Sequence, residues 1–168
     1  MDDPRERIAA WGQRSRAARL ERLAATPAAL DRALADAPTG ALARRPEAAA
    51  WAPVEIVCHL RDVEESYFER LSLILASDEP RFPTTNPDRW AVERQYLRND
   101  ARAATRGFAA RRGQTLALFA GLAEEAWARA GWQMDSRGRR TIEDFLTVMA
   151  WHDENHLAQL TRALEGRA

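Results

Sequence analysis

The chain has 168 residues, 46% hydrophobic and 30% charged, a composition that predicts one globular domain over residues 1–168. Its 25 basic residues, all arginine, balance 25 acidic ones, so no overall charge draws it to nucleic acid or to a membrane surface. No apolar run approaches the ~20 residues that span a bilayer, and the acidic start MDDPRERIAAW lacks the apolar segment of a signal peptide. The single cysteine, Cys58, excludes an internal disulfide, and we expect a cytoplasmic protein.

Helical spacing of apolar residues begins near the N-terminus. It predicts a first helix from about Pro4 to Leu34, with Pro27 inside it expected to kink or restart the helix. Pro38 and Gly40 end this segment, and residues 44–52 form a connector.

A second helix is predicted from Pro53 to about Ala76, because proline suits the first helical position. Three prolines predict a loop over residues 78–88, and a short helix is expected around Trp90–Leu97. A third helix is predicted over about Asp100–Leu122.

After a predicted loop at residues 127–140, a fourth helix opens at Thr141. Asp144, three residues on, completes a capping-box pattern, and the helix runs to about Leu164. No segment has the alternation typical of a strand. These elements predict an all-α fold, a four-helix bundle with an extra short helix in a connector.

All three histidines of the chain fall on the predicted inward faces of these helices. His59 lies on the inward line of the second helix, and His152 and His156 lie four residues apart on that of the fourth. The inward line of the second helix is Ile56, His59, Val63, Ser66 and Arg70. The inward line of the fourth helix is Ile142, Phe145, Met149, His152, His156 and Leu160.

Three inward imidazoles would each need hydrogen-bond partners, and an unpaired buried group costs roughly 1–3 kcal/mol. A shared metal ion removes this difficulty, and three protein ligands leave a coordination position open, as in catalytic sites. The alternative is that each histidine is an ordinary core residue. A zinc-protease motif is not matched, because Asp153 replaces the glutamate of HExxH. A carboxylate di-iron bundle is not matched either, because no Glu-x-x-His pair is present.

Two stretches, "WAPVEIVCHLRDVEESYFERL" at 51–71 and "WHDENHLAQL" at 151–160, resemble the signatures of the DinB superfamily of DinB/YfiT-like metalloenzymes. The threonine-led start "GRRTIEDFL" fits the same pattern. The resemblance implies a four-helix bundle in up-down-down-up order and a divalent metal, zinc or nickel, held by His59, His152 and His156. Homodimers are common in that family, so the resemblance also implies a homodimer.

The chain departs from the family pattern at two places. Ala52 precedes the second helix where many relatives have serine or threonine, which are better N-caps. The loop before the fourth helix reads "WQMDSRGRR" where many relatives have a His-Pro pair.

Further charged residues on these helices have two interpretations each. Glu64 is a candidate general base for an activated water, or the partner of an arginine. Arg70 is a candidate for binding a substrate carboxylate, or a member of a structural ion pair, and the same holds for Arg112. Asp62 and Asp153 are candidates for orienting the imidazoles, or lie on a solvated face.

A divalent ion held by three neutral imidazoles would lower the pKa of a bound water or thiol. Some DinB-like relatives are thiol-dependent S-transferases or isomerases. We therefore expect metal-dependent attack of a low-molecular-weight thiol cosubstrate on a small-molecule substrate, in detoxification or stress response. The alternatives are metal-assisted hydrolysis, a non-catalytic bundle stabilised by its metal, and a metal-free interaction module.

Overall fold

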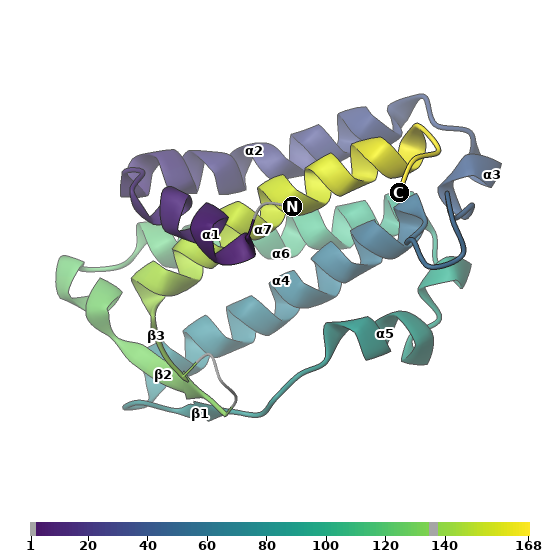
Figure 1. Cartoon of the computed structure of the whole chain (residues 1–168). Helices are drawn as coiled ribbons and strands as arrows, with labels where there is room; N and C mark the ends of the chain where they lie inside the picture. Colours follow the sequence, from purple (N-terminus) through teal and green to yellow (C-terminus); the bar gives the residue numbers. More distant parts are fainter. Residues whose placement is uncertain (1–2, 135–137) are drawn as a thin grey trace.

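The computed structural model describes residues 3–134 and 138–168, except for the side chain of Asp88. Its main body is a four-helix bundle of α2 (Arg16–Ala35), α4 (Pro53–Ala76), α6 (Ala101–Ala120) and α7 (Ile142–Leu164) (Figure 1). The helices α2 and α7 run in one direction and α4 and α6 in the other, the up-down-down-up order. Both α2 and α4 pack against α6 and α7. The predicted all-α bundle is confirmed.

Shorter elements cover the edges of the bundle. The helix α1 (Pro4–Gly12) packs against α7, and α5 (Pro87–Glu93) packs against α4. Three further short elements occur in the connectors: α3 (Thr39–Leu42) and the 3₁₀ helices η1 (Tyr96–Arg98) and η2 (Glu124–Ala128). The predicted short helix in a connector is therefore present, as α5 and η1. Within the described part of the chain, no helix combines the length and the apolar character needed to cross a bilayer.

The single N-terminal helix predicted from the sequence is wrong. The structure has two helices there, because Ser15 caps the start of α2 by accepting a hydrogen bond from the Ala18 N–H, 3.1 Å away. Pro27 neither ends nor restarts α2, which continues through it. Leu23 and Leu30, on either side of the proline, are fully buried, so packing against the bundle holds the helix together at this point.

The two predicted loops at residues 78–88 and 127–140 contain strands. A small sheet has the order β1 (Arg81–Phe82), β2 (Ala130–Gln133), β3 (Gly138–Thr141), with β1 parallel and β3 antiparallel to β2. Strands of two to four residues are too short to give an alternating pattern in the sequence. Gly131 is needed in β2, because a Cβ there would lie 2.5 Å from the ring of Phe82. Residues 135–137 of the second predicted loop lie outside the described residues.

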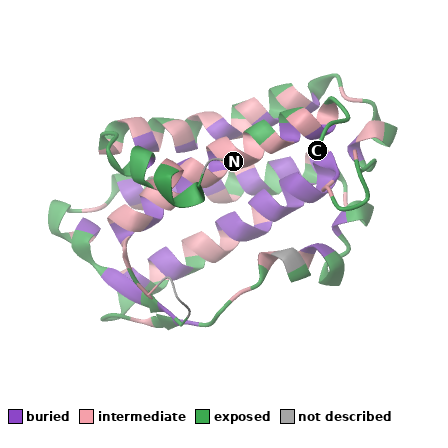
Figure 2. Ribbon diagram, viewed as in Figure 1, coloured by how far each residue is buried: buried purple, intermediate pink, exposed green. Residues whose placement is uncertain are grey.

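The predicted boundaries of α4 and α7 are confirmed. Glu55 accepts a hydrogen bond from the Ala52 N–H at 2.9 Å and pairs with Arg45, which offsets the missing side-chain cap at Ala52. At α7, Thr141 and Asp144 form the predicted capping box, with bonds of 2.9 and 3.0 Å. Figure 2 shows α4 as the most continuously buried helix over its first two turns, which fixes His59 in position.

Candidate metal centre

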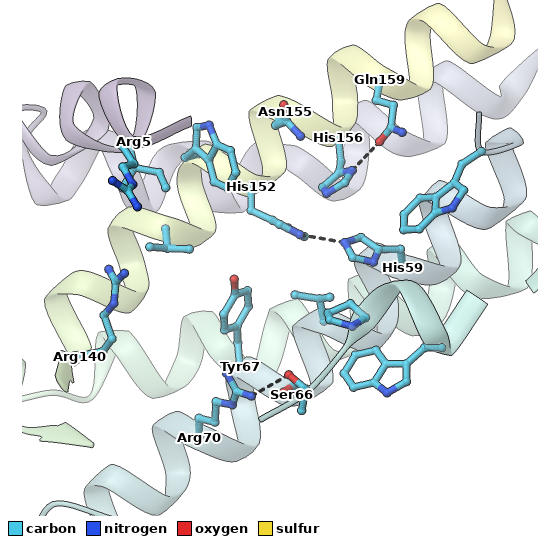
Figure 3. A pocket seen from close by; sticks show the side chains of 18 of the residues that line it. Arg5, His59, Ser66, Tyr67, Arg70, Arg140, His152, Asn155, His156 and Gln159 are labelled. Carbon is cyan, nitrogen blue, oxygen red and sulfur yellow. Dashed lines mark hydrogen bonds between the residues drawn. The ribbon is translucent and has the colours of Figure 1, made fainter. Parts of the chain in front are cut away.

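The three histidines converge between α4 and α7. Each ring offers a nitrogen, and these nitrogens all lie within 4.8 Å of one another. His59 Nε2 faces His152 Nε2 at 3.1 Å across the gap between the two helices (Figure 3). His156 lies one turn further along α7, with its ring centroid 4.6 Å from that of His59. The helical spacing read from the sequence thus brings all three imidazoles to one place.

Gln159 orients the ring of His156. Its Oε1 lies 2.8 Å from His156 Nδ1 and accepts the Nδ1–H (Figure 3). This hydrogen bond leaves the Nε2 lone pair of His156 for the cluster, which is the usual arrangement around a metal-binding histidine. Gln159 was missed as a functional residue in the sequence, although it stands three residues after His156 on the same helical face and closes the second DinB-like signature.

The electrostatic surroundings keep two of the rings neutral. Burial, together with the neighbouring His156, lowers the pKa of His59 to about 3. Burial also lowers the pKa of His152 well below its ordinary value, with smaller contributions from His156 and His59. Neutral imidazole is the form that binds a metal ion.

The donor set fits a divalent cation. The Nε2 atoms of His59 and His152 lie 3.1 Å apart, so at most one of the two carries a proton and at least one presents a lone pair. His59 Nδ1 is also buried without a hydrogen-bond partner among the described residues. One cation would accept all three lone pairs at once, which hydrogen bonds among the rings cannot do.

Aromatic side chains restrict how far these rings can turn. Trp51 packs against His59 with ring centroids 4.9 Å apart, and Tyr67 meets His152 edge-on at 6.1 Å. A preorganised set of rings needs little reordering when it binds a ligand.

The cluster borders a pocket of about 830 Å³. The pocket is lined from α1, α4, α5 and α7, and Figure 3 shows that it extends from the histidines towards Arg70 and Arg140. Its volume is in the range of small-molecule sites.

The charged candidates divide between the pocket and the bundle core. Arg70 lines the pocket, and its guanidinium hydrogen-bonds Thr85 at 3.1 Å and Gln133 at 3.5 Å. Glu64 is not among the lining residues. It accepts hydrogen bonds from Arg112 at 2.8 Å and from Thr115 at 2.6 Å inside the core, so the structure does not bring it to the histidines.

The suggested orienting roles of Asp62 and Asp153 are wrong. Asp62 binds Tyr96 at 2.7 Å, besides Arg61 and Arg94, and Asp153 binds Arg112 at 2.5 and 3.0 Å. These partners, rather than the imidazoles, take the hydrogen bonds found at the two carboxylates among the described residues.

Cys58 contributes nothing to the cluster, although it precedes His59 in the chain. It is fully buried in the core, and burial raises the pKa of its thiol to about 11. A protonated, inaccessible thiol is a poor ligand and a poor nucleophile.

The fold and the site together define a four-helix bundle with three convergent histidines beside a pocket. The chain matches the model of the DinB superfamily over residues 22–160 and belongs to that family. It is 22% identical over 111 residues to a Bacillus subtilis protein named "Putative metal-dependent hydrolase YfiT", a match that covers 66% of this chain and 62% of that protein.

A solved structure of YfiT from Bacillus subtilis superposes with a TM-score of 0.84 at 20% identity, over 93% of this chain and 92% of that one. Its description calls YfiT "a probable metal-dependent hydrolase with an unusual four-helix bundle topology". At this identity the likeness establishes the shared fold.

Proposed function

We propose that this chain is a metal-dependent enzyme that activates water or a low-molecular-weight thiol for attack on a small-molecule substrate. The single observation that carries the proposal is the convergence of all three histidines on one point at the wall of a pocket. His59, His152 and His156 are the proposed ligands of one divalent ion, zinc or nickel.

When bound, a divalent ion supplies Lewis acidity and lowers the pKa of a coordinated water or thiol. The chain's own residues do the rest. The imidazoles of His59, His152 and His156 would hold the ion, and Gln159 keeps His156 in the tautomer that presents Nε2. Trp51 and Tyr67 restrict the turning of the rings of His59 and His152, and the pocket beside the histidines would receive the substrate.

Hydrolysis is supported by the name of the related Bacillus subtilis protein, and the match covers 62% of that protein's length. Transfer of a low-molecular-weight thiol is supported by the resemblance of the two histidine signatures to the family. A pocket of about 830 Å³ also has room for a cosubstrate beside a small electrophile. Glu64 is paired inside the core, so neither version assigns it a catalytic role.

A non-catalytic, metal-stabilised bundle is the alternative. Such a site is closed by a fourth protein ligand. Among the described residues, the group of possible ligands at this point consists of three histidines, and the pocket lies against them. This arrangement favours catalysis over a purely structural role.

The proposal is tested by measuring metal per chain in untagged protein by mass spectrometry. We expect about one divalent ion per chain, lost in His152→Ala and retained in Asn155→Ala. Asn155 lines the same pocket one turn away and is the matched control. Metal content unchanged by His152→Ala would refute the ligand assignment.

Activity is tested on metal-loaded protein with a panel of esters, amides and electrophiles, with and without glutathione, mycothiol or bacillithiol. Turnover without thiol identifies a hydrolase, and turnover only with thiol identifies a transferase. Metal retention without turnover on any substrate would favour the structural alternative. The homodimer and the cytoplasmic location stay predictions, for sizing by light scattering and for cell fractionation.

A further inference from the structure

We propose that the end of the pocket remote from the histidines binds the anionic group of the substrate, and that the substrate is an elongated small molecule with a carboxylate or sulfonate on an apolar body. This inference rests on the proposed function, because the histidine end is taken as the place of reaction.

The charge of the pocket wall is the first observation. Four arginines line it, and no aspartate or glutamate is found among its described lining residues. The chain as a whole has equal numbers of acidic and basic residues, so this one-sided lining is local. A concave site lined by one sign of charge concentrates ligands of the opposite sign. The four are Arg5, Arg70, Arg140 and Arg162.

A buried hydrogen-bond donor at the remote end is the second observation. Arg140 Nε is buried without a partner among the described residues, and Arg140 lines the pocket. A guanidinium nitrogen can only donate, so only an acceptor satisfies it. Leaving it unpaired costs roughly 1–3 kcal/mol, and an oxygen of an anion would remove that cost. No carboxylate among the described residues forms an ion pair with Arg140, whereas its strand neighbour Arg139 pairs with Glu79 at 2.8 Å.

The position of these groups sets the shape of the ligand. Arg70 follows His59 by eleven residues on α4, a rise of about 16 Å along the helix. Arg140 lies in β3, just before α7 begins, and His152 is ten residues, or about 15 Å, along that helix. In Figure 3, Arg70 and Arg140 lie on the far side of Tyr67 from the histidines.

The wall between the two ends is largely apolar. Val63, Tyr67, Val148 and Trp151 line this stretch of the pocket. An apolar or aromatic body between a reactive group and an anionic group therefore matches the wall, and a planar carboxylate matches the fork of an arginine.

The test uses three probes of one shape: naphthalene-2-carboxylate, naphthalene-2-sulfonate and the uncharged naphthalene-2-carboxamide. Each is titrated by calorimetry into the full-length protein as purified, with metal content measured in parallel. We expect both anions to bind about tenfold or more tighter than the amide, the contribution of one charge-assisted hydrogen bond. Equal affinity for the three probes would overturn the proposal.

The variants locate the effect. Arg140→Gln should abolish the preference for the anions. Arg139→Gln removes the same charge one residue away, from an exposed side chain outside the pocket lining, and should keep the preference. Circular dichroism checks that each variant is folded. A preference that survives Arg140→Gln, or that falls equally in Arg139→Gln, overturns the proposal.

The two proposals fail separately. Bound metal without any preference for anions rejects only the anion site. A preference for anions in a protein that binds no metal at the histidines rejects only the proposed function.

Discussion

Arg112 Nη1 donates a hydrogen bond of 3.0 Å to the carbonyl oxygen of Leu23. Leu23 stands four residues before Pro27, which has no N–H, so this carbonyl has lost its usual helical donor. The same guanidinium binds Glu64 of α4 and Asp153 of α7. One side chain from α6 therefore contacts the three other helices of the bundle, among them both helices that carry the histidines.

Replacing Arg112 with methionine should destabilise the fold by about 3–5 kcal/mol, because the carboxylates of Glu64 and Asp153 would be left buried without their counter-charge. Burial acts to lower the pKa of Arg112, but the charges of Asp153 and Glu64 raise it above its ordinary value, so it is charged at every accessible pH. Urea unfolding measures the change. Arg111→Met is the control, since its partly exposed pair with Glu65 should contribute no more than about 1 kcal/mol. Equal losses in the two variants would contradict this assignment.

Pro27→Ala restores the N–H that the Leu23 carbonyl lacks. In the wild type Arg112 already satisfies this carbonyl, so the restored donor has less to add. In the Arg112→Met background the substitution should stabilise by about 1 kcal/mol more than in the wild type. A double-mutant cycle from urea unfolding gives this coupling, and a value of zero would show that the two donors act independently.

Gln159→Ala should weaken divalent-metal binding about 10- to 100-fold, because His156 loses the acceptor that fixes its tautomer. Gln159→Glu keeps an acceptor at this position and should restore most of the affinity. Competition with a chromophoric chelator measures the binding, with Asn155→Ala as the control from the same helix. Unchanged affinity in Gln159→Ala would mean that the hydrogen bond does not orient the ring.

The metal-free protein should lose stability as the pH falls below 6.5. The folded-state pKa of His59 is about 3 and its ordinary value is 6.5, so between these limits the unfolded chain binds a proton that the folded chain does not. The contribution of His59 is complete above pH 6.5 and is lost at about 1.4 kcal/mol per pH unit down to about pH 3.

Urea unfolding of the wild type and of His59→Gln over this pH range, in the presence of chelator, measures the free energy of unfolding of each. The difference between the two pH profiles separates the contribution of His59 from that of the carboxylates. The two proteins share every other titrating group. Parallel pH profiles for the two would show that His59 is not held neutral in the fold.

The helices and the histidine lines were readable from the sequence because they depend on local rules. Pro53 and the Thr141–Asp144 box mark helix starts through backbone hydrogen bonding within a few residues. The spacing of four between His152 and His156 places both on one helix face in any helix. The short strands were not predicted. The strand β1 pairs with β2 some fifty residues further along the chain, and β2 and β3, though close in the sequence, are too short to show an alternating pattern.

The sequence by itself determined the bundle helices and the face on which each histidine stands, since periodicity and capping act within one or two turns. Only the tertiary structure decided which side chains meet. Arg112 binds both Glu64 and Asp153, and the Nε of Arg140 is buried beside the pocket without a partner among the described residues. Helical period fixes the direction of a side chain, whereas its partner depends on which helices pack together and on their relative height.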